Sequence, residues 1–359
     1  MSRSVIEAAK RGWDGLRRRV AMWRWDRPQV SSAGFEDRIV FVRWDAKLGD
    51  TIVLSWVFRE LQRQRPDLQI TVITAESFKE LFVQGYGIDS VFVAGKRHDW
   101  AKLNEIARQI RHPRYVVHLS LRWRPRDIRF VRELAPEHVV GLDDELKLVD
   151  IKLGEQTRGL HFSQKLVPWL NQIGVDTTNQ HYWIPRSAQA SQQIDAWWPK
   201  LTPQARVIGL CPYGASKKRR LSDAQVIEIV SELLNETENY VLLIAQPDDL
   251  KHLQSVLDWQ LWSERVLLRK TANFFSMFEF VSRCQAIVSV DTATVHLATG
   301  FSLPTLALYA PQRSDSENMR FWHPCSSKAT TLIASAGESE AMGHFDKQEM
   351  VSALQRLFL

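Results

Sequence analysis

Long apolar stretches, cysteine pairs and nucleotide-binding glycine motifs are all missing from this sequence. No run of about 18 uncharged apolar residues occurs, so we expect no membrane-spanning helix. The three cysteines, Cys211, Cys284 and Cys325, are widely spaced and form no C-x-x-C pair, which argues against a disulfide scaffold or a zinc site and indicates reduced thiols. The absence of a G-x-G-x-x-G fingerprint argues against a nicotinamide-dependent enzyme.

Excess positive charge is small and is confined to one end of the chain. The 359 residues contain 47 Lys and Arg against 41 Asp and Glu, for a net charge of +6. Residues 1–30 hold eight of the basic and three of the acidic residues, so this segment alone carries +5. A nearly neutral body without a recognition motif argues against a nucleic-acid partner.

The N-terminal segment has the apolar spacing of an amphipathic helix. Apolar residues recur at steps of three and four, at Ile6, Ala9, Trp13, Leu16, Val20 and Trp23. Most of the arginines lie away from this stripe, and Pro28 should end the helix. A basic helix with tryptophans suits an anionic membrane surface; the alternative is that the stripe packs on the protein itself or on a second copy. Charges interrupt the segment too often for a secretory signal.

After a predicted linker at residues 31–34, strands alternate with helices in two series. The first series has predicted strands at 38–42, 70–74, 90–94, 115–119 and 139–142, and the second at 207–211, 240–245, 266–268, 286–290 and 305–309. Such alternation implies parallel sheets with helices on both faces. We therefore predict an α/β protein of two Rossmann-like halves, joined by a polar connection near residues 175–203.

The loop 45–50 joins the first predicted strand to a helix predicted over residues 51–64. Ligands of open α/β sheets bind outside the carboxyl ends of the strands, where this loop lies. Gly49 permits a close backbone approach, and Asp50 is predicted at the helix N-terminus. Asp50 is therefore either a helix cap or a catalytic carboxylate.

The loop 211–222 contains four consecutive cations at the equivalent place in the second half. They are Lys217, Lys218, Arg219 and Arg220, and they follow Gly214 in a strand-to-helix turn. Backbone N–H groups, the helix dipole and these side chains all favour a phosphate. The alternative interpretation is a solvated surface patch.

A third loop follows the strand 286–290 and begins another helix. Asp291 is suited to accept hydrogen bonds from sugar hydroxyls, and the N–H groups after Thr292 are suited to bind a diphosphate. Alternatively, Asp291 or Thr292 only caps the helix, and His296 is a buried core residue.

These loops resemble the motifs of glycosyltransferase family 9, the heptosyltransferase-like enzymes of lipopolysaccharide core assembly. The resemblance rests on R-W-D-A-K-L-G-D-T-I-V-L-S from Arg43 and S-V-D-T-A-T-V-H-L-A-T-G-F-S-L-P-T-L-A-L-Y from Ser289, and it covers residues 38–325. It implies a GT-B fold, in which two Rossmann-like domains face each other across a central cleft. It also implies transfer of heptose from a nucleotide diphosphate sugar, without a metal or another cofactor.

The resemblance also assigns roles to individual residues. It makes Asp50 the general base of an inverting displacement at the anomeric carbon. The donor site is predicted to contain Asp291, Thr292, Ala293 and His296, with a phosphate-binding cation among Lys217, Lys218 and Arg219. The sequence has no D-x-D triplet, in agreement with a metal-independent site. Ala293 replaces the family's usual glycine, and this difference bears on the identity of the donor sugar.

Arginine is concentrated in residues 108–132, where Asp127 is the only acidic residue among eight arginines. Because arginine binds phosphate bidentately, we predict that Arg122, Arg124 and Arg126 bind a phosphorylated acceptor, with Lys47 as a further candidate. The alternative is a solvated, arginine-rich helix.

Together, these inferences predict an enzyme that transfers heptose from ADP-heptose to a phosphorylated lipopolysaccharide core acceptor. We expect it in the cytoplasm, associated peripherally with the inner membrane through residues 1–30. Transfer of a hexose or N-acetylhexosamine, and non-catalytic binding of core oligosaccharide, are the alternatives. The predicted divisions are 1–34 (basic extension and linker), 35–180 (acceptor domain), 181–345 (nucleotide-sugar domain) and 346–359 (C-terminal helix).

Overall fold

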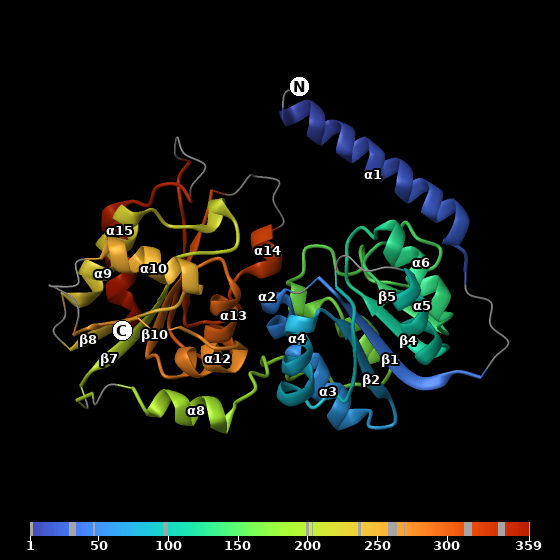
Figure 1. The fold of residues 1–359 in the computed structure, drawn as a ribbon, viewed down its shortest axis with the longest axis horizontal. Helices are drawn as coiled ribbons and strands as arrows, with labels where there is room; N and C mark the ends of the chain where they lie inside the picture. Colours follow the sequence, from blue (N-terminus) through green and yellow to red (C-terminus); the bar gives the residue numbers. More distant parts are fainter. Residues whose placement is uncertain are drawn as a thin grey trace. The chain divides into compact units, whose positions relative to one another are not determined.

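The chain forms two compact units, each built on one six-stranded parallel sheet (Figure 1). Unit 1 comprises Met1–Lys47 and Trp56–Gln180, and unit 2 comprises Leu48–Ser55 and His181–Leu359. This computed structural model describes residues 3–28, 34–45, 47–95, 100–198, 201–202, 204–235, 238–257, 264–268, 270–311, 318–336 and 342–358. Residues 31–33 of the predicted linker lie outside the described residues.

The sheet of unit 1 has the strand order β3-β2-β1-β4-β5-β6, with parallel pairing throughout. Its strands are β1 (Glu36–Arg43), β2 (Gln69–Thr74), β3 (Ser90–Val93), β4 (Pro113–His118), β5 (His138–Gly141) and β6 (Ile151–Lys152). Its helices are α1 (Arg3–Trp25), α3 (Ser55–Gln64), α4 (Glu76–Glu80), α5 (Trp100–Gln109), α6 (Pro125–Leu134) and α7 (Val167–Gln172). Shorter helical turns lie at Leu81–Gly85 and Phe162–Gln164.

Helices cover both faces of this sheet, as the residues of β1 illustrate. Val40 and Val42 join the apolar cluster formed with α5 and α6. Phe41 points to the other face, where its ring lies 5.1 Å from that of Phe58 on α3. Consecutive buried residues on opposite faces explain why Ile39–Val42 of β1 form an unbroken apolar run rather than an alternating pattern.

The sheet of unit 2 has the order β12-β11-β10-β7-β8-β9 and is also parallel. Its strands are β7 (Arg206–Cys211), β8 (Asn239–Leu243), β9 (Val266–Leu268), β10 (Ala286–Val290), β11 (Thr305–Tyr309) and β12 (Ala329–Ile333). Its helices are α2 (Leu48–Val53), α8 (Ala188–Asp195), α9 (Asp223–Leu234), α10 (Pro247–Val256), α12 (Phe274–Ser282), α13 (Ala293–Gly300), α14 (Asn318–Trp322) and α15 (Lys347–Gln355), with 3₁₀ turns at Lys217–Arg219 and Arg356–Phe358.

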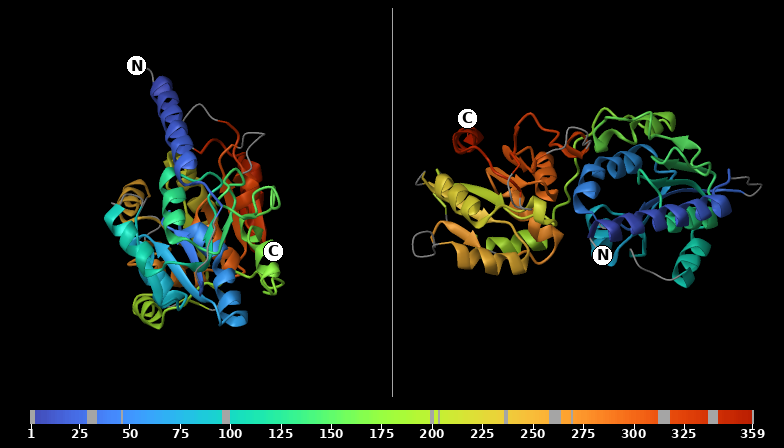
Figure 2. Two further views of the ribbon diagram at one scale, coloured as in Figure 1. Left: turned by 90° about the vertical axis from the view of Figure 1, so that its right-hand side faces the viewer. Right: turned by 90° about the horizontal axis from the view of Figure 1, so that it is seen from above.

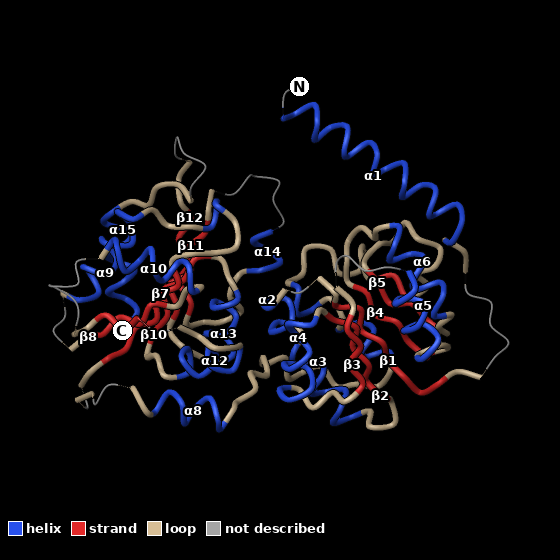
Figure 3. Tube along the Cα trace, viewed as in Figure 1, coloured by secondary structure: helices blue, strands red, loops and turns tan. Residues whose placement is uncertain are grey.

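Both sheets therefore have the strand order of a Rossmann fold when the strands of each unit are counted from its own first strand (Figure 3). The predicted α/β class with two Rossmann-like halves is confirmed. The short strands β6 and β12 are additions to the predicted set.

The helix predicted over residues 51–64 is divided into α2 and α3. The hydroxyl of Ser55 donates a hydrogen bond to Ile52 O (2.6 Å) and accepts one from Trp183 N (2.8 Å). A serine that binds nearby backbone groups competes with the regular helical pattern, which accounts for the break.

Helix α1 packs on α6, and its N-terminal half projects beyond that helix (Figures 1 and 2). Arg18 and Ala21 are buried in this contact, whereas Trp13 and Trp23 of the predicted apolar stripe are exposed. The predicted helix is present, and Trp13, Leu16, Val20 and Trp23 of its apolar stripe are exposed. Among the described residues, no helix combines the length and the apolar character needed to cross a bilayer.

Candidate active site

The loops after β7 and β10 meet within unit 2. These strands are neighbours in the sheet, at the point where the strand order reverses. Open α/β sheets bind ligands at such a reversal, outside the carboxyl ends of the strands. The cationic loop after β7 and the turn at Asp291 and Thr292 therefore form the candidate donor site.

Thr292 caps helix α13 at the end of β10. Its Oγ1 accepts a hydrogen bond from Thr294 N (3.3 Å) and lies 3.1 Å from the Ser289 hydroxyl. The N-terminus of α13 thus lies beside the cationic loop. Its partial positive charge favours a phosphate at the same edge of the sheet.

Asp291 is a buried carboxylate beside a single arginine. Its side chain is 14% exposed, and an oxygen lies 3.6 Å from the Arg219 guanidinium, which also donates to Asp291 O (3.1 Å). Burial raises the pKa of Asp291 above the ordinary value, and the charge of Arg219 opposes this effect. Among the described residues, Asp291 has one ion-pair partner although it is largely desolvated. Such a carboxylate is suited to accept hydrogen bonds from ligand hydroxyls.

The cationic loop approaches this turn closely because residue 214 is glycine. A Cβ atom at Gly214 would lie 2.9 Å from Arg219 O and 3.3 Å from Thr292 Cγ2. Lys217 and Lys218 lie in an exposed 3₁₀ turn, while Arg219 is directed to Asp291. The structure therefore brings one of the three predicted phosphate-binding cations, Arg219, into contact with the predicted donor site.

Arg220, the fourth cation of the loop, is paired with Asp249 on α10. Arg220 forms an ion pair with Asp249 (2.5 Å) and lies over the Tyr213 ring, 4.1 Å from its centroid. This pair fixes the far end of the cationic loop against α10.

Helix α2 carries Asp50 and packs on α13, although it follows β1 in the sequence. Gly49 makes this contact possible, because a Cβ atom there would lie 3.1 Å from His296 Cδ2 and 3.7 Å from Ala293 Cα. Asp50 is half-buried in the first turn of α2. The predicted base thus lies on the helix that touches the donor-site residues Ala293 and His296.

His296 is buried, with 3% of its surface exposed. Its ring lies edge-on to Tyr182 and Trp322, with centroids 6.5 and 6.2 Å away. His296 therefore supports the contact between α2 and α13, as the buried-residue alternative predicted. Tyr182 and Trp322 could not be identified from the sequence, because neither lies near the motif.

The acceptor candidates of unit 1 differ in their exposure and in their contacts. Arg126 lies over the Trp44 ring (4.2 Å to its centroid) and beside Asp127, and burial lowers its pKa. Arg124 is exposed at the N-terminus of α6, and Lys47 is exposed before α2. Arg122 is exposed and lines a cavity beside α1.

Two further arginines of the predicted cationic stretch hold α1 in place. Arg129 lies over the rings of Trp100 and Trp25, at 3.7 and 5.5 Å from their centroids. Arg132 donates to the main-chain oxygens of Arg27 and Pro28, each at 3.3 Å. Arg129 and Arg132 therefore contact other parts of unit 1, whereas a solvated, arginine-rich helix would leave them in water.

No disulfide joins Cys211, Cys284 and Cys325, and burial raises the pKa of the Cys284 thiol well above its ordinary value. In the described part of the chain, no three His, Cys, Asp or Glu side chains gather as potential metal ligands.

Comparison with known proteins agrees with this geometry. Residues 172–352 match the family model for glycosyltransferase family 9 (heptosyltransferase). The chain is 23% identical over 325 residues to the "Putative lipopolysaccharide heptosyltransferase 4" of Escherichia coli K12, covering 87% of this chain and 84% of that one.

Two solved structures share the fold. One is a glycosyl transferase family 9 protein from Veillonella parvula (TM-score 0.70, 19% identity, 91% of this chain and 99% of that one). The other is the E. coli ADP-heptose lps heptosyltransferase II (TM-score 0.67, 17% identity, 89% and 98%). The two parallel sheets are thus those of a GT-B fold, and the chain belongs to glycosyltransferase family 9, the heptosyltransferase family.

Proposed function

We propose that this protein is an inverting glycosyltransferase that transfers heptose from ADP-heptose to a phosphorylated lipopolysaccharide core acceptor. The observation that carries the proposal is the packing of α2 on α13, which joins the Asp50 helix to Ala293 and His296 of the donor motif. Membership of family 9 and the names of the relatives support the donor and the acceptor.

In the proposed reaction, the Asp50 carboxylate accepts the proton of the acceptor hydroxyl. The oxygen attacks the anomeric carbon from the face opposite the diphosphate, a C–O bond forms, and the bond to the diphosphate oxygen breaks with inversion. General-base catalysis of this kind contributes about 10²- to 10⁴-fold to the rate.

The leaving diphosphate gains negative charge as its bond to the sugar breaks. Arg219, the exposed Lys217 and Lys218, and the N-terminus of α13 supply positive charge at the same edge of the sheet. We propose that these groups stabilise the leaving group without a metal or another cofactor, while Asp291 and Thr292 bind hydroxyl groups of the donor.

For the acceptor, Lys47 and Arg124 are the exposed candidates of unit 1 that carry the proposal. Arg126 is less available, because it is held on Trp44 and Asp127. Arg122 lines the cavity beside α1, whose lining includes neither Lys47 nor Arg124.

We further propose that the protein acts in the cytoplasm, associated peripherally with the anionic surface of the inner membrane through residues 1–30. The net charge of +5 on this segment and the exposed tryptophans of α1 support this association.

The test is transfer from ADP-heptose to a heptose-deficient core oligosaccharide by the full-length protein. The Asp50→Asn variant should lose about 10²- to 10⁴-fold in kcat, while the Kd of ADP in calorimetry stays within about threefold. Asp45→Asn is the matched control, because Asp45 is half-buried in the same loop and pairs with Arg43 (3.6 Å). Full activity of Asp50→Asn would contradict the assignment of the base.

A different donor sugar is the second candidate, favoured by Ala293 at the family's glycine position. Ala293 lies against Gly49, so its methyl group alters the surface beside the base. A panel of nucleotide sugars decides between the donors, and exclusive use of a UDP-hexose or UDP-N-acetylhexosamine would overturn heptose. Binding of core oligosaccharide with no product from any donor would indicate a non-catalytic binder.

A further inference from the structure

The orientation of α1 is fixed by a buried arginine. Arg18 binds both oxygens of Asp143 (2.9 and 3.0 Å) and one oxygen of Glu145 (2.7 Å). Directly after the helix end, the side chain of Asp26 accepts a hydrogen bond from Leu148 N (2.7 Å). A charged side chain is buried only where it is paired, so these contacts determine which face of α1 is turned to unit 1.

The opposite face of α1 is apolar and exposed. Trp13, Leu16, Val20 and Trp23 follow at steps of three and four residues and are 62%, 53%, 52% and 78% exposed. They account for four of the eight exposed large apolar side chains in the described part of the chain. Apolar side chains gathered in this way, rather than scattered singly, mark an interaction surface.

Arginines border this apolar face along both edges. At about 100° per residue, Arg17 and Arg24 lie on one side of the stripe and Arg19 lies on the other. Interfacial helices insert such an apolar face between lipid chains while their cations meet the anionic headgroups. A second protein surface would need to supply matching acidic groups on both edges, so the charge favours a lipid surface.

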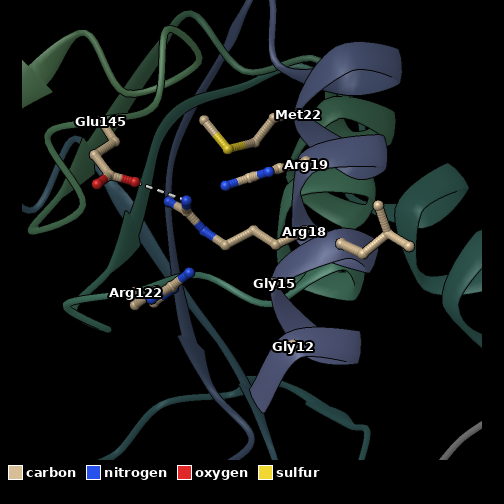
Figure 4. Close-up of a pocket in the computed structure, with 8 residues that line it drawn as sticks. Gly12, Gly15, Arg18, Arg19, Met22, Arg122 and Glu145 are labelled. Carbon is tan, nitrogen blue, oxygen red and sulfur yellow. Dashed lines mark hydrogen bonds and ion pairs between the residues drawn. The ribbon is translucent and has the colours of Figure 1, made fainter. Parts of the chain in front are cut away.

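A cavity lies beside Arg19, between α1 and the body of unit 1 (Figure 4). Its volume is about 670 Å³, within the range of about 300–1,000 Å³ that is typical of ligand sites. The lining residues on α1 are Gly12, Gly15, Leu16, Arg18, Arg19 and Met22, and those on the body are Arg122 and Glu145.

Two glycines of α1, Gly12 and Gly15, are among the residues that line this cavity. A Cβ atom at Gly12 or Gly15 would meet no atom within 4 Å. Glycine inside a helix costs about 1 kcal/mol relative to alanine, so α1 has space here at the expense of helix propensity.

The cavity combines two cations with an apolar wall. Arg18 is neutralised by Asp143 and Glu145, whereas Arg19 and Arg122 have no carboxylate of the described residues within ion-pair distance. Figure 4 shows these guanidinium groups around the same space. Arginine recognises phosphate through paired N–H donors, and Leu16 and Met22 offer an apolar surface next to it.

We propose that this cavity binds the headgroup of an anionic phospholipid, with the phosphate between Arg19 and Arg122. The exposed stripe of Trp13, Leu16, Val20 and Trp23 lies among the acyl chains of the same leaflet. This inference rests on the proposed association of residues 1–30 with the membrane, and it adds a phosphate site that involves the body of unit 1.

The test is flotation of the full-length protein with vesicles of mixed phosphatidylglycerol and phosphatidylcholine, and with pure phosphatidylcholine vesicles. Wild type should prefer the anionic vesicles. Each basic residue at an anionic surface is worth about 1 kcal/mol, so Arg19→Gln with Arg122→Gln should weaken this binding by about 30-fold. Trp13→Ala with Trp23→Ala should weaken binding to both kinds of vesicle.

Two matched controls separate a site from general charge attraction. Arg17→Gln with Arg24→Gln removes the same charge from the far edge of α1, outside the cavity, and should weaken anionic binding less than Arg19→Gln with Arg122→Gln. Gly15→Leu fills the cavity and raises helix propensity, so it should reduce the preference for phosphatidylglycerol with unchanged helix content in circular dichroism. Leu160→Ala, at an exposed apolar residue outside α1, should have no effect.

Several results would overturn the inference. These are equal losses in the two arginine pairs, no reduction by Gly15→Leu, or competition of millimolar inorganic phosphate for the site, which would indicate a free anion. Association of the protein in sedimentation that depends on Trp13 and Trp23 would assign the stripe to a second copy. Flotation needs no turnover, so failure to bind vesicles by a protein that transfers heptose to a soluble acceptor refutes this inference and leaves the proposed reaction intact.

Discussion

Two buried aspartates, one in each unit, lie beside arginines near the end of a parallel strand, and their environments differ. Asp127 is surrounded: it lies 3.5 Å from His118 and 3.4 Å from Arg126, and it accepts a hydrogen bond from Arg124 N (2.8 Å). Asp291 has one arginine at 3.6 Å. Both side chains are largely shielded from solvent, at 4% exposed for Asp127 and 14% for Asp291, and they differ in the number of their partners.

The pKa values of the two carboxyls shift in opposite directions for this reason. Burial alone would raise the pKa of Asp127, but His118, Arg124 N and Arg126 hold it below the ordinary value. Burial raises the pKa of Asp291, and Arg219 compensates only in part. A fully partnered carboxylate stabilises the fold, whereas a carboxylate with few partners costs stability and is suited to a ligand.

The largest effect is expected for Asp127→Ala. Removing one member of a buried charged group leaves the others unpaired and costs about 3–5 kcal/mol. Urea unfolding followed by circular dichroism should show this loss in the free energy of unfolding. A loss below about 1 kcal/mol, the usual size for a surface ion pair, would contradict the structural role of Asp127.

Asp291→Asn should raise thermal stability and weaken donor binding, unlike Asp127→Ala. The amide removes a buried charge, so thermal stability at neutral pH should rise slightly. The KM for the donor should rise by about 10- to 100-fold, because a hydrogen bond to a charged acceptor is worth about 1.5–3 kcal/mol. Donor titrations and calorimetric melting of one preparation measure both effects, and lower stability with unchanged KM would make Asp291 a structural residue like Asp127.

Lys217, Lys218 and Arg219 of the cationic loop differ in their exposure and in their contact with Asp291. Arg219→Gln should raise the donor KM by about tenfold, because this side chain lies at Asp291 and its loss also leaves that carboxylate without its ion-pair partner. Lys217→Gln and Lys218→Gln should change KM by less, since both side chains are exposed and screened. A larger effect at Lys218 would transfer the phosphate contact to that residue.

The smallest effect concerns pH. The lowered pKa of Asp127 contributes stability above the ordinary value of 3.8, and this contribution is lost as pH falls through the folded-state pKa. The raised pKa of Asp291 has the opposite sign: its ionisation costs stability at neutral pH, and protonation removes the cost as pH falls toward 3.8.

Melting temperatures of Asp127→Asn, Asp291→Asn and wild type from pH 7 to pH 3 test this assignment. As pH falls, the higher melting temperature of Asp291→Asn should approach that of wild type first, and the lower melting temperature of Asp127→Asn should do so at a lower pH. Each unit of difference between the folded and unfolded pKa corresponds to about 1.4 kcal/mol in the free energy of unfolding. Parallel curves for the two variants would show that the environments do not differ as described.

The sheets were predictable from sequence because their strands are buried on both faces. Continuous apolar, mostly β-branched runs such as the one in β1 are typical of strands in a parallel sheet. The strands β6 (Ile151–Lys152) and β12 (Ala329–Ile333) escaped prediction, since β6 is two residues long and β12 is mostly half-buried and lacks a continuous apolar run.

Charged and aromatic contacts between distant segments were not predictable. Arg126 and Arg129 belong to the arginine-rich stretch from which a phosphate site was predicted. In the structure, Arg126 lies over the Trp44 ring and Arg129 lies over the Trp100 ring. No local spacing encodes these contacts, because the tryptophans belong to other elements. The apolar stripe of α1 was recognisable, but the partners of Arg18 decide which face of the helix is buried.

The place of α2 has a consequence for any attempt to divide the protein. Unit 2 is not a continuous piece of chain, because Thr51, Ile52 and Val53 are buried in the helix that packs on α13 while the rest begins at His181. A fragment of residues 181–359 would expose the surface of α13 on which α2 packs and would lack Asp50. Separately expressed halves should therefore recover a complete donor unit only when a peptide containing residues 48–55 is supplied with the second half.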